Sequence, residues 1–382
     1  MYKDIRKPKL LVISDTPVAK KNGEYYGFEP VVRELEAIAP LFDKIIWLAS
    51  VEKSESDALR KPTSSKIEIV PMPGVRRRDI YHKFSIPFKY LAFIFYIIKY
   101  LPAATHVHTR GPSHPALIGI LISLIDRKRI YWHKYAGNWI AEDLAASYKL
   151  QKTLLLASKS KNIKVSVNGK WPGSPKQIFA FENPCIYEDE RIRAGGSALE
   201  KDFTNKLSIL YVGSLSEFKG ILKLIEVIEN KQMPARIEKL YIVGNGPLYK
   251  TLQKKISNIS SQVKIELLGH LNRTEIDEYY KKSHVIILPS NSEGFPKVIA
   301  EGAAFGCIPL VTDISSISQY VITGENGILI KEPTVACISD ALTSLCEMKD
   351  LKKISINAID MCRKFTYEYF IERLKNEIFD LN

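Results

Sequence analysis

SNSEGFPKVIAEGAAFG, residues Ser290 to Gly306, directly follows the apolar run HVIILPS. The β-branched and aliphatic residues of that run predict a strand. Gly294 and Pro296 oppose an immediate regular helix, and helix-forming residues with an apolar face begin at Lys297. The stretch therefore predicts a strand, a turn and a helix N-terminus. In an open α/β sheet, ligands bind at this place, outside the carboxyl ends of the strands.

Two carboxylates frame the predicted turn, Glu293 before it and Glu301 eight residues later. Carboxylates are strong acceptors for pairs of sugar hydroxyls, so Glu301 could hold a ribose and Glu293 a second sugar. Backbone N–H groups at the helix start suit an anion or sugar hydroxyls; these belong to Gly294, Phe295, Lys297 and Val298, whereas Pro296 has none. A second interpretation stays open here: acids in the first turn can simply complement the helix dipole.

Length and composition indicate a globular protein with two domains. The chain has 382 residues, of which 46% are hydrophobic and 25% are charged. Its five cysteines are widely spaced and form no CxxC pair, which indicates a reducing compartment and no structural zinc. The N-terminal MYKDIRKPKLLVISD lacks the apolar region of a signal peptide, so we predict a cytoplasmic location.

Apolar strands alternate with helical stretches along the whole chain, which predicts two doubly wound α/β domains. The expected strands are KLLVISD, KIIWLAS, KIEIVPM, HVHTRG, RIYWHKY, IKVSVN and QIFAFEN, then LSILYVGS, EKLYIVGN, VKIELLG, HVIILPS, CIPLVTD and NGILI. KNGEYYGFEP reads as a glycine-bearing loop. The predicted division is residues 1–186, a polar linker or surface loop at 187–205, and residues 206–364, with a C-terminal helix at about 365–382 packing back on the first domain. Two such domains would face each other across a cleft, the usual place for a ligand.

The net charge of +13 is diffuse except near VRRRDIYHK, residues Val75 to Lys83. An aromatic, apolar stretch, Phe84 to Pro102, follows it. Within that stretch Lys89 and Lys99 bracket nine apolar residues, which is too short to span a bilayer. A basic run beside such a helix suits an anionic membrane surface, and a core helix of an α/β domain is the alternative.

The second half contains two further strand–turn–helix motifs. In YVGSLSEFKG, Gly213 allows close backbone approach, and Lys219 with the following helix start suits a phosphate. In YIVGNGPLYKTL, Gly244 and Gly246 open a helix after a strand. GNGPLY lacks the third glycine of a dinucleotide fingerprint, so a nicotinamide enzyme is disfavoured.

Taken in order, VGSL…FKG, VGNGP, SEGFPKVIAEGAAFGCIPLVT and GENGILI resemble the C-terminal domain of the large family-4 type of retaining GT-B glycosyltransferases. This family builds capsule, lipopolysaccharide and glycolipids from nucleotide sugars. The resemblance covers residues 207–330 closely, and the first half only in architecture. It implies the GT-B fold, two Rossmann-like domains facing each other across a cleft.

The resemblance also implies roles for residues of this sequence. Glu301 would hold the ribose hydroxyls, and Glu293 the transferred sugar beside the backbone of residues 294–298. Lys219 would hold the diphosphate and stabilise its leaving charge. Gly213 would let the backbone approach the phosphates, and the base would lie near Gly244 and Leu271. The family often has arginine where this chain has Ser214, so another cation would be needed; Arg110, Lys134 and Lys297 are candidates.

Candidates in the first half are KKNGEYYG, residues Lys20 to Gly27, placed like the family's glycine loop, and the strand ends HVHTRG and YWHKYAGNW. In the family, a histidine in the second of these loops lies close to the reacting sugar, and His133 is the nearest match. A structural histidine is the alternative. His106 and His108 share one face of their strand, but no third ligand is spaced to complete a metal site.

The resemblance therefore implies an enzyme that moves a sugar from a UDP- or GDP-linked donor, with retention of anomeric configuration. Cations and helix N-termini would replace a metal ion, and a diphosphate oxygen would take the acceptor proton. The acceptor would be a saccharide or lipid-linked saccharide, at the inner face of the cytoplasmic membrane if the basic run binds lipid. A nucleotide-sugar epimerase or hydrolase on the same fold is an alternative. A basic protein that binds nucleic acid is disfavoured, because no such module is recognisable.

Overall fold

A computed structural model describes residues 8–51, 59–74 and 82–379, and the side chains of 82–87 are outside the description. The chain divides into two compact units. Unit 1 comprises Met1–Phe181 with Ile371–Asn382, and unit 2 comprises Glu182–Phe370. The predicted basic run at residues 76–78 lies outside the described residues.

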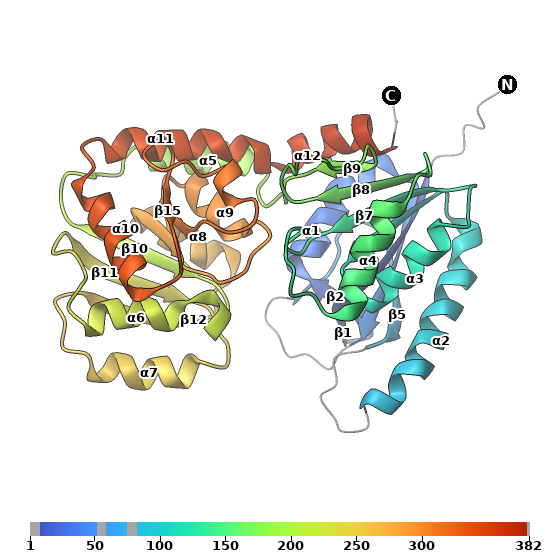
Figure 1. The fold of residues 1–382 in the computed structure, drawn as a ribbon, viewed down its shortest axis with the longest axis horizontal. Coiled ribbons are helices and arrows are strands. Elements are labelled where there is room, and N and C mark those ends of the chain that lie inside the picture. Colours follow the sequence, from blue (N-terminus) through green and yellow to red (C-terminus); the bar gives the residue numbers. More distant parts are fainter. Residues whose placement is uncertain (1–7, 52–58, 75–81, 380–382) are drawn as a thin grey trace. The chain divides into compact units, whose positions relative to one another are not determined.

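Unit 1 is built on a mainly parallel sheet in the order β5-β3-β1-β6-β7-β8-β9 (Figure 1). Its central strands carry buried aliphatic and aromatic residues, as expected for a sheet covered on both faces. The strands are β1 (Lys9–Lys21), β3 (Lys44–Val51), β5 (Ile67–Pro73), β6 (His106–Gly111), β7 (Ile130–Tyr135), β8 (Ile163–Val167) and β9 (Ile178–Ala180).

The predicted glycine-bearing loop after β1 is instead a β-hairpin. β1 continues past a register shift between Ile13 and Pro17 and turns at Asn22-Gly23 into the antiparallel strand β2 (Glu24–Phe28). Both turn residues have positive φ, 51° and 84°, which is the geometry that Asn-Gly favours in two-residue hairpins. A short strand, β4 (Leu59–Arg60), pairs with β2.

The helices of unit 1 cover its sheet with the apolar faces that the sequence predicts. Val32, Leu35 and Ile38 of α1 are fully buried. Phe93 and Ile97 of α2 join a core with Val107 and Tyr131 of the sheet. The helices are α1 (Glu29–Ile38), α2 (His82–Tyr100), α3 (His114–Ser123) and α4 (Ala146–Ala157), with 3-10 turns at Ala39–Leu41 and Leu101–Ala103.

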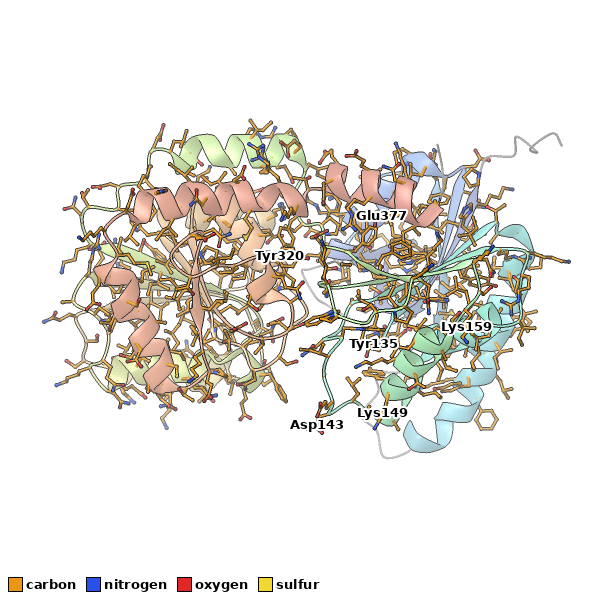
Figure 2. All side chains as sticks on the ribbon, turned by 45° about the horizontal axis from the view of Figure 1, so that its top comes forward. Tyr135, Asp143, Lys149, Lys159, Tyr320 and Glu377 are labelled. Carbon is orange, nitrogen blue, oxygen red and sulfur yellow. The ribbon has the colours of Figure 1, made fainter. Side chains whose placement is uncertain are left out.

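The C-terminal segment of the chain packs on this same unit. Phe379 makes edge-to-face contacts with Phe42, His106 and Trp132. Glu377, labelled in Figure 2, pairs with Arg373 at 2.6 Å, and its carbonyl lies 3.4 Å from the Lys164 ammonium. The segment consists of the end of α12 (Tyr367–Arg373) and a π-helical stretch, Leu374–Phe379.

Unit 2 has a wholly parallel sheet in the order β12-β11-β10-β13-β14-β15. Its strands are β10 (Leu207–Val212), β11 (Ile237–Val243), β12 (Lys264–Gly269), β13 (Val285–Leu288), β14 (Ile308–Thr312) and β15 (Ile328–Ile330). The intervening helices are α6 (Ile221–Glu229), α7 (Tyr249–Asn258), α8 (Arg273–Lys282), α9 (Lys297–Ala304), α10 (Val335–Glu347) and α11 (Leu351–Met361), with 3-10 turns at Glu217–Lys219, Ile317–Gln319 and Cys362–Phe365. The prediction of two doubly wound α/β sheets is confirmed.

Residues 187–205, expected to form a linker or surface loop, include helix α5 (Glu188–Ala198) of unit 2. The Glu190 carboxylate accepts from the Tyr187 N–H at 2.9 Å, which caps the helix start. Ala194 and Ala198, one turn apart, are buried. The sequence did not predict this helix, because its composition is polar and two alanines give little hydrophobic periodicity.

Candidate active site

The switch point of the unit 2 sheet lies between β10 and β13. β10 pairs with β11 on one side and with β13 on the other, so the chain leaves these two strands in opposite directions across the sheet. Loops after strands flanking such a point diverge and leave a crevice, which is where open α/β sheets bind ligands. Lys219 follows β10, and Glu293 follows β13.

Glycines set the backbone path around this point. Gly244 has φ of +141°, and a Cβ there would lie 1.9 Å from the Gly213 carbonyl oxygen. Gly220 has φ of +70°, and its Cβ would lie 1.9 Å from the Pro289 oxygen. Only glycine permits such contacts. The loop after β10 therefore lies directly against the ends of β11 and β13.

This approach brings together the two charged side chains that the sequence singled out. The ammonium of Lys219 and the carboxylate of Glu293 form a hydrogen-bonded ion pair, the switch-point pair. Their side chains are 27% and 11% exposed. Burial and then the charge of Glu293 raise the pKa of nearby Tyr211. The pair thus places one cation and one anion, both partly accessible, at the edge where a ligand would bind.

Helix α9 begins at Lys297, as predicted, and its entry is fixed by aromatic packing. Phe295 stacks on Phe365 with ring centroids 4.3 Å apart and meets Tyr320 edge-on at 5.2 Å. Tyr320, labelled in Figure 2, donates to Glu182 at 3.2 Å. The side chains of Phe295 and Pro296 are buried. These two residues therefore offer backbone, rather than side chain, to a ligand.

Glu301 forms a second charged cluster in unit 2. Its carboxylate lies 3.2 Å from Nη1 of Arg273 and accepts from the Tyr280 hydroxyl at 3.3 Å. Burial would lower the pKa of Arg273, but the charges of Glu301 and Glu190 outweigh it and the pKa is raised. Burial raises the pKa of Asp277 to about 6, with Arg273 opposing the rise. Arg273 and Tyr280 were not predicted from the sequence. They lie on helix α8, and nothing in their local sequence indicates a contact with Glu301 on helix α9.

The other predicted binding residues of unit 2 lie along the same strand ends. The Gly213 N–H donates to the Val243 carbonyl at 3.0 Å, and the Tyr211 hydroxyl donates to the Ser214 carbonyl at 3.0 Å. The Ser214 side chain is exposed. A serine at this place supplies a hydroxyl but no positive charge, so Lys219 is the cation that the loop after β10 offers.

Two cations proposed from the first half have a structural partner instead. Arg110 and Lys134, at the ends of β6 and β7, both bind the carboxylate of Glu34, at 2.6 and 2.8 Å. The Glu34 side chain is 1% exposed, so this is a buried triad. Glu34 was not predicted from the sequence either. It lies on the apolar face of α1 between Val31 and Ile38, and a carboxylate at such a position is expected to have a buried partner.

The prediction that His133 is catalytic does not fit its position. The side chain is 1% exposed, its Nδ1 lies 2.7 Å from the Thr109 hydroxyl, and its Nε2 lies 3.1 Å from that of Ser123. Ser123 donates its own proton to the Ile120 carbonyl at 2.6 Å. Nε2 is therefore the donor and Nδ1 the acceptor of a neutral ring, and burial lowers the pKa of His133 to about 3. The structural interpretation left open above is the one observed.

Comparison with known proteins identifies a family that matches most of unit 2. Residues 199–361 match the family described as "Glycosyl transferases group 1". An uncharacterized glycosyltransferase of Haemophilus influenzae is 26% identical over 262 residues, which are 65% of this chain and 68% of that protein. A putative teichuronic acid biosynthesis glycosyltransferase of Bacillus subtilis, TuaC, is 26% identical over 50% of this chain and 49% of that protein. An uncharacterized glycosyltransferase of Methanocaldococcus jannaschii is 28% identical over 42% and 44%. The chain thus spans about half the length of two of these relatives.

Solved structures extend the likeness of fold to both units. Anabaena Alr3699/HepE, crystallised in complex with UDP and glucose, superposes with a TM-score of 0.68 over 98% of this chain and all of that chain, at 15% identity. Sucrose-phosphate synthase from Thermosynechococcus elongatus gives 0.68 over 99% of this chain and all of that chain, at 16% identity. Residues 199–361 thus resemble the glycosyltransferase group 1 family, and the chain has an α/β fold with parallel sheets like that of these GT-B structures.

Proposed function

We propose that this protein is a retaining hexosyltransferase that moves a sugar from a UDP- or GDP-linked donor to a saccharide or lipid-linked saccharide. The observation that carries the proposal is the switch-point pair, Lys219 with Glu293, inside the glycosyltransferase group 1 domain. HepE, of the same fold, has been crystallised with UDP-glucose. TuaC is named a putative teichuronic acid biosynthesis glycosyltransferase, and in this proposal the present chain acts in cell-surface polysaccharide synthesis.

In this proposal each charged group acts on one part of the donor. Lys219 binds the diphosphate and stabilises the charge that develops as the glycosidic bond breaks. Glu293 accepts hydrogen bonds from the transferred sugar, and Glu301 from the ribose. The N-terminus of α9 adds positive potential beside the phosphates, and no metal ion is required. Arg273 and Tyr280 hold Glu301 and orient it for this contact.

A thermal-shift panel with UDP, GDP, ADP and CMP at millimolar concentration tests the donor site. A ligand at about a hundred times its Kd stabilises a protein by roughly 2.7 kcal/mol, so the matching nucleotide will stand out. We expect Glu301→Ala to abolish that shift. Glu325→Ala, an exposed carboxylate of unit 2, is the control that keeps it. A panel in which no nucleotide shifts the wild type contradicts the proposal.

The matching sugar nucleotide then separates transfer from the alternatives. A transferase consumes little donor until a saccharide acceptor is added, and the product keeps the anomeric configuration of the donor. Donor consumption by the protein alone would assign an epimerase or hydrolase instead. Anomeric configuration is read by NMR of the product, and inversion would exclude the retaining mechanism.

A further inference from the structure

Helix α2 of unit 1 has a large apolar surface that no other described element covers. It is apolar around most of its circumference from Tyr90 to Ile98, yet only one side of it reaches the core, through Phe93 and Ile97. The opposite side exposes large side chains, here called the α2 stripe: Phe88 at 74%, Leu91 at 65%, Ile94 at 37%, Phe95 at 61% and Ile98 at 58%.

The spacing of these residues places them on one continuous face. At 100° per residue they occupy an arc of about 120°, and at 1.5 Å per residue they extend about 15 Å along the helix axis. A contiguous apolar patch of this kind marks an interaction surface rather than an ordinary scatter of exposed residues. Side chains of α2 project away from the sheet (Figure 2), and the helix lies against α3 and β5 (Figure 1).

One more exposed apolar residue, Ile125, lies near the C-terminal end of α2. It follows α3 and is 82% exposed. The guanidinium of Arg129 binds the carbonyls of Leu101 and Ala104 at 3.0 and 3.1 Å, which ties the loop after α3 to the segment that follows α2. These bonds place the loop that carries Ile125 beside the segment after α2.

The charges around this surface are positive. Lys99 borders the α2 stripe, and Arg127 and Lys128 are exposed beside Ile125. Helix α2 contains no acidic residue, and the carboxylate of Asp126 is paired with Arg129 at 2.6 Å. An apolar face bordered by cations is complementary to an anionic bilayer, whose interface takes up aromatic and aliphatic side chains while its headgroups attract lysine and arginine.

A second copy of the chain fits this surface less well. In a two-fold symmetric contact the same patch faces itself, so the lysines of the two copies would lie together with no acid from α2 between them. No helix in the described part of the chain is long and apolar enough to cross a membrane. We therefore propose that unit 1 docks on an anionic membrane surface through the α2 stripe and Ile125, with α2 lying along the interface.

Co-sedimentation of the full-length protein with lipid vesicles tests this docking. The vesicles are phosphatidylcholine alone, or phosphatidylcholine with about one third phosphatidylglycerol, at low and high salt. Wild type is expected to bind the anionic vesicles, and to bind them less at high salt because screening weakens the attraction. Leu91→Asp/Phe95→Asp is expected to lower the partition coefficient at least about tenfold.

Two matched controls separate the proposed surface from general effects. Ile192→Asp/Leu199→Asp makes the same change at residues of unit 2 that are 61% and 60% exposed, and should bind like wild type. Lys99→Gln/Lys128→Gln should weaken binding to anionic vesicles about 25-fold at low salt, at about fivefold per lysine. Lys250→Gln/Lys254→Gln, on the exposed side of α7, should leave binding unchanged.

Three results would overturn the proposal. The first is no binding of wild type to anionic vesicles at low salt. The second is unchanged binding of Leu91→Asp/Phe95→Asp. The third is a wild-type dimer, seen by light scattering, that this variant converts to a monomer, which would assign the surface to a second copy. The nucleotide-induced thermal shift is expected to be unchanged in the α2 variants, so failure of docking is distinguishable from failure of the proposed function.

Discussion

The two sheets of this protein carry charged residues at equivalent places, but in opposite states. In unit 2 the switch-point pair follows β10 and β13 and stays partly exposed. In unit 1, Arg110 and Lys134 end β6 and β7 and are bound by a buried carboxylate, Glu34. Both sets looked alike in sequence, as charged residues near the ends of strands. The difference is that helix α1 supplies a buried counter-ion to the two cations of unit 1, whereas the switch-point pair is partly exposed.

A similar contrast holds between His133 of unit 1 and Glu293 of unit 2. His133 lies within strand β7 of unit 1, where both ring nitrogens are hydrogen-bonded to hydroxyls. Glu293 lies at a strand end in unit 2, where a glycine-lined turn leaves it accessible. Four variants or conditions, in descending order of expected effect, test whether unit 1 uses these groups for stability and unit 2 for binding.

Loss of Glu34 should have the largest effect. Glu34→Ala leaves two buried cations without their shared anion, and we expect a loss of about 3–5 kcal/mol in the free energy of unfolding. Glu68→Ala is the matched control, because Glu68 pairs with Lys44 at the surface, where both side chains are almost half exposed, and such pairs contribute at most about 1 kcal/mol. Urea unfolding followed by tryptophan fluorescence reports on unit 1, which contains all four tryptophans. Equal losses in the two variants would contradict a buried structural triad.

Loss of the switch-point cation should act on turnover instead. We expect Lys219→Ala to slow turnover of the sugar nucleotide about 10²–10³-fold, as the loss of one transition-state donor does elsewhere, with unfolding unchanged. Glu293→Ala should slow it strongly as well. Lys223→Ala is the control, because Lys223 lies one turn further on, with its Nζ 3.4 Å from the Asn291 side chain. Wild-type rates in both site variants would remove the assignment.

His133 should show the reverse pattern. His133→Ala leaves the Thr109 hydroxyl without its acceptor and removes the N–H that donates to Ser123, and we expect a stability loss of about 1–3 kcal/mol. Turnover per folded molecule should stay near wild type, whereas removal of a general acid or base costs about 10²–10⁴-fold. His270→Ala, an exposed histidine of unit 2, controls for the substitution itself. A large loss of turnover at unchanged stability would restore the catalytic interpretation.

The pH dependence of stability should show the smallest effect. The pKa of His133 is lowered from 6.5 to about 3 in the folded protein, so its stabilisation is present above about pH 6.5 and is lost as the pH falls. Between pH 7.5 and 6.0 this amounts to about 0.8 kcal/mol for one buried histidine. Asp277 has the opposite sign: its pKa is raised from 3.8 to about 6, so its contribution is lost as the pH rises.

Unfolding of wild type and His133→Asn at pH 7.5 and 6.0, followed by tryptophan fluorescence, measures this difference. The variant should lose about 0.8 kcal/mol less than wild type over this interval. An identical loss in the two proteins would show that the ring is not held neutral in the folded state.

The sequence by itself determined the alternation of strands and helices and the start of α9, because these depend on local periodicity and on glycine and proline. It also placed Lys219 and Glu293 at strand ends, since their motifs are contiguous. Asn22-Gly23 carried a hairpin signal as well, and the loop interpretation overlooked it. Helix α5 was harder to predict, because its buried face consists of Arg191 and two alanines.

Only the tertiary structure decided which strand-end groups stay accessible. The pairing of Lys219 with Glu293 depends on strand order, which brings β10 beside β13. The counter-ion of Arg110 and Lys134 comes from α1, more than seventy residues away in the chain. Whether α2 is a core helix or a surface helix also depended on what covers it, and the structure shows one side buried and the other exposed. Burial and counter-ions are set by residues distant in sequence, so local patterns do not reveal them.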